Sequence, residues 1–346
     1  MRTSRRSMLQ MVGACTAAVG IGACVRKDTA TAPAAAEEEA VAEPTIGDPI
    51  QSLEIIGTGY LWTEGPVWLG GEDGHLLFSD VPGNTIYSWV PRVGELPDGV
   101  YSWAGDTTTV FLRPSGRDGA LPMRDQVREG GANGLALGRG GLVICDSGNR
   151  CISVVDLATR QKTVLVDRYE GKRLNSPNDL VVARNGDIYF TDPPYGLVGV
   201  NDSPLRELDF SGIFRLTPDN QLHVIADDLF PNGIGLSPDN RILYVNTRSG
   251  RMAFDLDTSG APLGRRVFTA REVPGGSGDG FTVDAVTGNL WCLSRGGIHV
   301  FTPDGERIGH RQFDGRTSNC AFGPQRYLYI TNGDRVLRCK IRAAFA

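Results

Sequence analysis

The chain of 346 residues carries a formal charge of −5, with 45 glycines, 20 prolines, 40% hydrophobic and 8% aromatic residues. Glycine at about twice its usual share, without a Gly-X-Y period, excludes collagen and favours a turn-rich all-β fold over a helical one. No cluster of Lys and Arg follows the first thirty residues, which argues against nucleic acid as a partner and favours a neutral or weakly charged small molecule.

The amino terminus is typical of an export signal. Three arginines within Met1–Arg6 precede the apolar segment Met8–Ala23, which is too short to span a bilayer comfortably. Ser4–Leu9 resembles a twin-arginine signal, with chance arginines before an ordinary signal as the alternative, and Ile21–Cys24 resembles a bacterial lipobox. We expect residues 1–23 to be removed, taking the charge from −5 to −8 with the loss of three arginines. A lipid on Cys24 would then anchor the protein in the periplasm or cell envelope.

Residues 24–48 predict a flexible acidic tether, because they are rich in Ala, Glu, Pro and Thr and contain no aromatic residue. Residues 49–346 form the predicted catalytic domain. Five of the seven cysteines lie in that domain, so at least one is free or pairs between chains. Cys145 and Cys151 flank the turn Asp146–Arg150, and we expect them to face each other across a hairpin, as thiols or as a disulfide. The oligomeric state is expected to be a monomer or a small homo-oligomer.

A repeat follows the tether. Each unit has a polar carboxylate or amide residue, a short apolar strand, a Gly/Asn/Asp turn, a second strand and then one or two more. The units begin at Glu64, Asn133, Asn178, Asn232, Asp279 and Asn319. Their spacings of 69, 45, 54, 47 and 40 residues suit four-stranded propeller blades with loop insertions, one of them around Pro91–Asp125.

Six units predict an all-β, six-bladed β-propeller with four-stranded blades. The last unit has room for only three strands, at Ala321–Phe322, Tyr327–Thr331 and Val336–Ile341. We expect Leu53–Gly57 to supply its fourth strand, which would remove the open edge of the array. No stretch after residue 48 keeps a helical period for ten residues.

The six unit starts are expected to converge at one mouth of the central channel, because the innermost strand of each blade runs along it. They comprise two carboxylates and four amides, an oxygen-donor set that suits a hard divalent cation. Calcium is the first choice, with magnesium and manganese as substitutes and zinc less natural without His or Cys ligands. The alternative is that Asn-Gly and Asp-Gly stand there as turn formers. Glu64 is not a turn former, and the shared register in all six units favours a metal site.

Five motifs occur in an order that resembles the gluconolactonase and senescence-marker-protein (regucalcin) family of six-bladed propellers. They are Thr63–Trp68, Asn175–Asp179, Phe190–Gly196, Phe230–Ile234 and Gly278–Phe281. The resemblance covers roughly residues 50–342. It departs from the senescence-marker branch at Ser176, where that branch has an arginine, so substrate contacts do not transfer from it.

The resemblance implies hydrolysis of a sugar-type lactone at a divalent cation. It implies Glu64, Asn232 and Asp279 as metal ligands, and Asn178 as a ligand or a contact to metal-bound water or substrate. Asn133 is the second candidate for substrate contact, and whether Asn133 or Asn178 completes the inner shell stays open. Asp279 is the expected base by family analogy, with Asp179 in reserve, although a backbone-bonding role suits Asp179 better.

Other chemistries fit the sequence less well. There is no G-x-S-x-G elbow, and the four histidines have no evident serine partner, with His310 expected in an exposed turn. Trp62, Trp68, Tyr195 and Trp291 line either a sugar-binding mouth or the core between blades. Two functional alternatives remain, a phosphotriesterase or arylesterase acting at the same metal site, as in propellers of the diisopropylfluorophosphatase type, and a non-catalytic binding propeller stabilised by metal.

Overall fold

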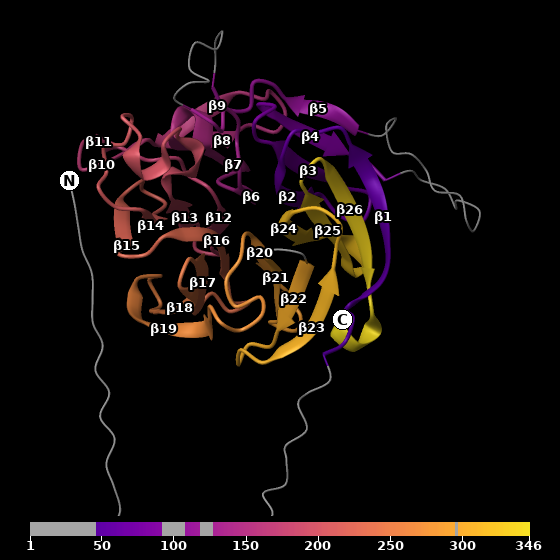
Figure 1. Ribbon diagram of the computed structural model, residues 1–346. Coiled ribbons are helices and arrows are strands. Elements are labelled where there is room, and N and C mark those ends of the chain that lie inside the picture. The colour runs from indigo at the N-terminus through magenta and orange to yellow at the C-terminus, as the bar shows by residue number, and fades with distance from the viewer. Residues whose placement is uncertain (1–45, 92–107, 118–126, 295–296) are drawn as a thin grey trace, which may run out of the picture. The chain divides into compact units, whose positions relative to one another are not determined.

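The computed structural model describes residues 46–91, 108–117, 127–294 and 297–346, and they are almost entirely β-structure (Figure 1). In these ranges the helical elements are five 3₁₀ helices of three residues each. Six four-stranded antiparallel sheets surround a central channel, with the first strand of each repeat unit innermost (Figure 1). This arrangement confirms the predicted six-bladed β-propeller.

Each of the first five blades uses four strands that are consecutive in the chain. A small two-stranded sheet lies outside the blades, just before the third one in the chain. The first blade holds β2 (Thr63–Leu69), β3 (His75–Asp80), β4 (Thr85–Trp89) and β5 (Thr108–Leu112), and the second holds β6 (Leu135–Gly138), β7 (Gly141–Asp146), β8 (Cys151–Val155) and β9 (Lys162–Val166). The third holds β12 (Leu180–Val182), β13 (Ile188–Asp192), β14 (Gly212–Leu216) and β15 (Leu222–Ala226), preceded by the hairpin β10 (Arg168–Tyr169) and β11 (Lys172–Arg173). The fourth holds β16 (Pro231–Leu236), β17 (Ile242–Thr247), β18 (Gly250–Leu256) and β19 (Pro262–Ala270), and the fifth holds β20 (Phe281–Val283), β21 (Leu290–Ser294), β22 (Gly297–Phe301) and β23 (Arg307–Gln312).

The sixth blade joins both ends of the propeller. It contains β24 (Thr317–Phe322), β25 (Tyr327–Asn332) and β26 (Arg335–Ile341), and the amino-terminal strand β1 (Ile50–Thr58) pairs antiparallel with β26 (Figure 1). The predicted closure is therefore confirmed, with a longer closing strand than expected. The inner strand β24 also begins four residues before the expected start at Ala321.

Residues at the end of the predicted tether dock on the fifth blade. The Gly47 amide donates to the Ile308 carbonyl at 3.1 Å, and Asp48 pairs with Arg311 at 2.5 Å. These contacts fix the chain just before it enters β1. The export signal, the Cys24 anchor and the rest of the tether lie outside the described residues, as does most of the Pro91–Asp125 insertion. Within that insertion, Thr108–Leu112 forms the outer strand of the first blade. No helix in the described part of the chain is long and apolar enough to cross a membrane.

Each interface between neighbouring blades has its own hydrophobic layer. Described side chains form six buried clusters, and each cluster takes residues from two adjacent blades. Phe190 of β13, for example, stacks on Phe214 at 5.2 Å and packs with Val143 of the second blade. A propeller therefore divides a core of this size into separate layers, which a single sandwich could not do.

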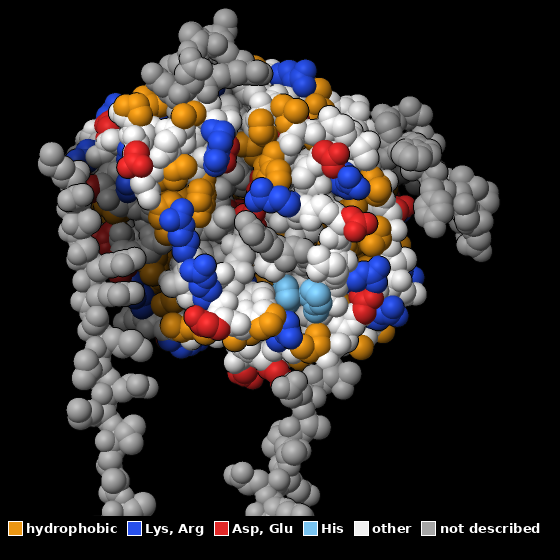
Figure 2. Space-filling view, in the orientation of Figure 1, with side chains coloured by type: hydrophobic (Ala, Val, Ile, Leu, Met, Phe, Trp, Pro, Cys, Tyr) orange, Lys and Arg blue, Asp and Glu red, His pale blue; other side chains and the backbone are white. Residues whose placement is uncertain are grey.

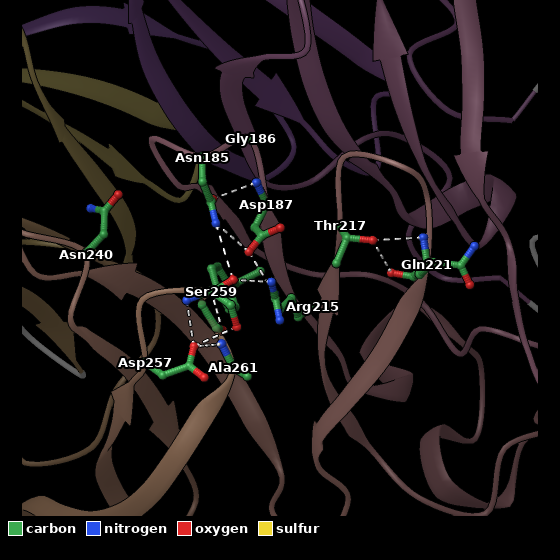
Figure 3. A network of polar contacts seen from close by, with 12 residues as sticks. Asn185, Gly186, Asp187, Arg215, Thr217, Gln221, Asn240, Asp257, Ser259 and Ala261 are labelled. Carbon is green, nitrogen blue, oxygen red and sulfur yellow. Dashed lines mark hydrogen bonds and ion pairs between the residues drawn. The ribbon is translucent and has the colours of Figure 1, made fainter.

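A polar network joins the third blade, through its β12–β13 turn and strands β13 and β14, to the β18–β19 turn of the fourth blade (Figure 3). Asp187, which is almost fully buried, accepts a hydrogen bond from Arg215 Nε at 2.7 Å. The same guanidinium contacts the Ser259 carbonyl in the turn between β18 and β19 (Figure 3). Tyr189 donates its hydroxyl to the Gly260 carbonyl at 2.6 Å, which completes the link.

The strand register corrects the expectation for two cysteines. Cys145 lies opposite Ile152, while Cys151 lies opposite Asp146. Successive residues of a strand point to opposite faces, so the two thiols face different sides of the sheet and cannot bond. Both are buried and free, as are the other three cysteines of the described chain.

Candidate active site

Five of the six predicted oxygen donors line one cavity of about 430 Å³, at the end of the channel where the inner strands begin. They are Glu64, Asn133, Asn178, Asn232 and Asp279. The structure therefore brings together the four expected metal ligands, Asp279 as the expected base among them, and Asn133 as the second candidate for substrate contact. The sixth donor, Asn319, does not line this cavity.

Backbone hydrogen bonds fix these side chains at the starts of the inner strands. The amide of Asn178 donates to the Thr191 carbonyl at 2.8 Å, and that of Asp279 donates to the Leu293 carbonyl at 2.9 Å. The Thr191 hydroxyl of the third blade also donates to the Asn232 carbonyl of the fourth blade at 2.8 Å. The second strand of one blade thus holds its own donor residue and that of the next blade.

Glycine follows four of the six donors, and the structure shows why. Of Gly65, Gly134, Gly233 and Gly280, only Gly65 has a positive φ, at 50°. A Cβ at Gly233 would lie 2.6 Å from the Asp279 carbonyl oxygen, and one at Gly280 would lie 2.2 Å from the Asn319 side chain. These glycines therefore permit the close approach of neighbouring inner strands. The turn-former alternative does not account for Gly134, Gly233 or Gly280.

Asp179 stands in the third blade where these four blades have glycine, and its carboxylate lies against the neighbouring inner strands. It accepts hydrogen bonds from the Leu180 amide at 2.9 Å, the Ile234 amide at 3.4 Å and Asn319 Nδ2 at 3.2 Å. Burial raises the pKa of Asp179 to about 6 against these three donors. Asp179 and Asn319 therefore link the third, fourth and sixth blades, and Asp179 has the backbone-bonding role that its sequence context favoured over that of a base.

The electrostatics of the cavity are set by two buried carboxylates from different blades. Burial raises the pKa of Glu64 well above its usual value, and the charge of Asp279 raises it further, while a 3.1 Å hydrogen bond from Trp62 Nε1 opposes the change. Burial likewise raises the pKa of Asp279 to about 7, against the hydrogen bond from Asn232 and the charge of Arg316. Two anions are thus held together with too little positive charge to stabilise both.

This donor set fits a hard divalent cation. Carboxylate and amide oxygens are the ligands that calcium prefers, and a cation would favour the charged forms of both carboxyls against the burial that raises their pKa values. Within the described residues, no group of three or more His, Cys, Asp and Glu side chains could hold a metal ion. The fit therefore depends on amides completing the shell around two carboxylates, as the sequence predicted.

Sequence reasoning missed a third carboxylate in the cavity, on Glu129. Asn133 and Arg128 hydrogen-bond to it, but its Oε2 has no partner, and burial raises its pKa. Arg128 also donates to the Tyr195 carbonyl at 2.5 Å. Arg128 and Glu129 precede β6, the inner strand of the second blade. They have no equivalent position in the other repeat units, so the sequence carried no signal for them.

Arg128 brings a guanidinium to the cavity. Residue 176, where the senescence-marker branch has an arginine, does not. The buried Ser176, which stands at that position, accepts a hydrogen bond from the Gly196 amide at 2.8 Å and does not line the cavity. Ser176 therefore supports the loop that carries Tyr195. The positive charge comes instead from Arg128 and Arg316.

The aromatic candidates divide between the two expected roles. Trp62 and Tyr195 line the cavity. Trp68 stacks on Tyr329 at 5.3 Å, and Trp291 is fully buried between the fifth and sixth blades. His310 lies in β23 rather than in an exposed turn, with its ring 4.5 Å from that of His299. These histidines are on the fifth blade and do not line the cavity.

Comparisons with known proteins agree with this fold. The family model described as "SMP-30/Gluconolactonase/LRE-like region" matches residues 62–334. A gluconolactonase from Zymomonas mobilis is 39% identical over 308 residues, covering 84% of this chain and 81% of that protein. A solved gluconolactonase structure from Xanthomonas campestris has a TM-score of 0.69 and 33% identity, covering 87% of this chain and 95% of the other.

A calcium-binding protein from Agrobacterium tumefaciens, described as regucalcin, shares the fold with a TM-score of 0.63. It is 20% identical and covers 86% of this chain and 95% of its own. The family model spans most of the propeller, and the Zymomonas mobilis relative matches along the same region. The chain therefore belongs to the SMP-30/gluconolactonase/LRE-like family.

Proposed function

We propose that this chain is a carboxylic ester hydrolase that opens sugar-type lactones with the help of a divalent cation, with calcium as the first choice. The observation that carries the proposal is one cavity in which Glu64, Asn178, Asn232 and Asp279 converge from four different blades. Such convergence places several oxygen donors around one point, although none of these residues is adjacent to another in the sequence. The gluconolactonase relatives supply the reaction class.

Those four side chains would hold the cation. Calcium takes six to eight oxygens at about 2.3–2.6 Å, so water or substrate oxygens would complete its shell. When bound, the cation supplies Lewis acidity toward the ester carbonyl and lowers the pKa of a coordinated water. Asn133, which lines the same cavity, would contact substrate.

Asp279 would accept the proton of the attacking water. The water oxygen forms a bond to the lactone carbonyl carbon, and the carbonyl electron pair moves onto oxygen. Arg128 and Arg316, both lining the cavity, would attract the negative charge that develops there. The bond between carbonyl carbon and ring oxygen then breaks as the carbonyl re-forms, and the ring oxygen takes the proton held by Asp279, which gives the open hydroxy acid and restores the carboxylate.

The test is hydrolysis of glucono-δ-lactone by the purified chain at fixed pH, corrected for the spontaneous reaction. We expect activity that is lost with chelator and restored by calcium. Asn178→Ala and Asn232→Ala should raise the calcium concentration that gives half-maximal activity. Hydrolysis that is insensitive to a chelator able to strip the ion would contradict the metal role. Turnover of phosphotriesters or aryl esters but not lactones would favour the other hydrolase chemistry, and metal-dependent stability without any turnover would favour a binding propeller.

We also propose that the enzyme works outside the cytoplasmic membrane, attached through Cys24. The support is the signal-like order of arginines, apolar segment and lipobox in the sequence. Membrane fractionation of the full chain and a Cys24→Ala variant tests this. We expect the parent chain in the membrane fraction and the variant in the soluble exported fraction.

A further inference from the structure

A second cavity of about 680 Å³ adjoins the candidate active site. The two cavities share Tyr195, Asn232, Asp279 and Arg316 in their walls. From there the second cavity extends toward residues that the mechanism does not use, among them Phe230, Arg248 and Arg271. A substrate whose ester lies at Asp279 would therefore have its far end in this second cavity.

The second cavity is strongly basic. Among the described residues that line it, three are arginines, Arg248, Arg271 and Arg316, and one is a carboxylate, Asp279. In the described part of the chain, none of the three has a carboxylate within ion-pair distance. Other exposed arginines do, since Arg265 and Arg266 each lie within 2.6 Å of an aspartate.

This concentration of positive charge runs against the composition of the chain, whose net charge is −5. Lys and Arg side chains border the central hollow of the face shown in Figure 2. The charge of Arg316 opposes the rise in the Asp279 pKa, and that of Arg248 opposes the rise in the Tyr195 pKa. No side-chain contact among the described residues accounts for Arg271.

Aromatic rings hold two of the guanidinium groups in place. The Arg248 guanidinium lies over the Phe230 ring at 3.5 Å and hydrogen-bonds with Tyr195, whose ring packs against Phe230 at 5.2 Å. The Arg316 guanidinium lies 4.8 Å from the Trp62 ring. Stacking uses the face of a guanidinium and leaves N–H groups at its edge, where carboxylate and phosphate oxygens bind in pairs.

We propose that the second cavity binds an anionic group of the substrate, so that the preferred substrate is a lactone carrying a carboxylate or a phosphate away from its ester. This inference rests on the proposed lactonase function. Both groups would offer negatively charged oxygens to the stacked arginines. The experiment below distinguishes a phosphate from a carboxylate.

The kinetic test compares three lactones with the purified, metal-loaded chain at low salt. They are glucono-δ-lactone, 6-phosphoglucono-δ-lactone and a glucaric acid monolactone, which differ in whether the far end is neutral, a phosphate or a carboxylate. We expect kcat/KM for one anionic lactone to exceed that for the neutral lactone by about tenfold or more, equivalent to about 1.4 kcal/mol. The preference should shrink as salt rises, because exposed charges are screened. Equal or lower kcat/KM for both anionic lactones would overturn the proposal.

The double variant Arg248→Gln with Arg271→Gln tests whether these arginines are responsible. We expect the ratio of anionic to neutral kcat/KM to fall toward one. Arg184→Gln is the matched control, because Arg184 is exposed, follows β12 at the opposite end from Asn178 and lines a separate cavity. It should keep the parent ratio. An unchanged ratio in a double variant that melts like the parent would overturn the proposal.

A binding measurement separates failure of this inference from failure of the lactonase function. Calorimetric titration with the open acids gluconate, glucarate and 6-phosphogluconate needs no turnover. If no lactone is hydrolysed but glucarate or 6-phosphogluconate binds at least tenfold tighter than gluconate, and the double variant loses that difference, the anionic cavity stands while the proposed reaction fails. If all three bind alike, the inference fails whatever the enzyme hydrolyses.

Discussion

Replacement of Asp279 by Asn should make the metal-free protein more stable while abolishing its response to calcium. The substitution keeps the shape of the side chain and an oxygen that accepts the Asn232 hydrogen bond, but removes one of the two buried charges. The remaining charge on Glu64 is then no longer raised in energy by a neighbouring anion.

The magnitude follows from the pKa of Asp279. Burial raises it from 3.8 to about 7, so the folded carboxyl holds a proton between about pH 4 and 7 that the unfolded one has lost. The stability of the metal-free parent therefore falls as pH rises through this window. Three pKa units correspond to about 4 kcal/mol above pH 7, which is an upper limit because Asp279 and Glu64 titrate together. At about 2 °C per kcal/mol, Asp279→Asn should melt up to about 8 °C higher at pH 8 in chelator.

The assay is thermal unfolding of parent and variant at pH 5 and pH 8, each with chelator and with calcium. We expect the variant to be more stable than the parent in chelator at pH 8, and the difference to shrink to about 1.6 kcal/mol at pH 5, because about 1.2 pKa units of the window remain below that pH. Calcium at about 100 times its Kd should stabilise the parent by about 2.7 kcal/mol and leave the variant unchanged. A variant no more stable than the parent at pH 8 in chelator would refute the repulsion argument. An equal calcium shift in both proteins would refute Asp279 as a ligand.

Three further predictions concern residues that support the fold. Asp179→Ala should lower the free energy of unfolding by about 3 kcal/mol in urea titrations, because it leaves buried amides and an Asn side chain without an acceptor; an equal urea midpoint would contradict its structural role. Asp187→Asn should cost about 3 kcal/mol in the same measurement by leaving Arg215 without its charge partner, and Arg215→Met in the Asp187→Asn background should recover part of the loss. Reducing agent should leave the melting temperature unchanged, because Cys145 and Cys151 are free thiols on opposite faces of their sheet; a drop on reduction would contradict that register.

Much of the fold was predictable because a propeller repeats one local pattern. The spacing of the units, the alternating strands and the missing fourth strand of the last unit together predicted six blades and the closing partner of β26. Strand limits were harder, since β24 begins at Thr317 only because its hydrogen-bonding partner β25 reaches Asn332. The pairing of Cys145 with Ile152 likewise depends on how the turn between β7 and β8 is built. A shift of one residue there decides which thiols can meet, and hairpin length alone does not specify it.

The ring of oxygen donors was predictable for the same reason. Which donors face the cavity depends on the residue that follows each of them in the sequence. In four blades the residue after the donor is glycine, because the adjacent inner strand leaves no room for a Cβ. In the third blade it is Asp179, which uses that small space to bind two amides and Asn319. The absence of glycine after Asn178 therefore marks where the channel is filled by a side chain. That difference explains why five donors face one cavity while Asn319 is held beside a buried carboxylate.

Residues outside the repeat register could not be predicted in this way. Glu129, Arg248 and Arg271 reach the two cavities from connections between strands, and no fixed spacing relates them to the donors. The blades set where an ester can be held, because the donors stand at the starts of inner strands and backbone hydrogen bonds hold them to the second strand of the blade. The connections set what surrounds the rest of the substrate, and Glu129, Arg248 and Arg271 lie outside the hydrophobic layers between blades. Substrate choice in this chain is therefore expected to follow from loop arginines that stand outside the repeat register of the carboxylates and amides.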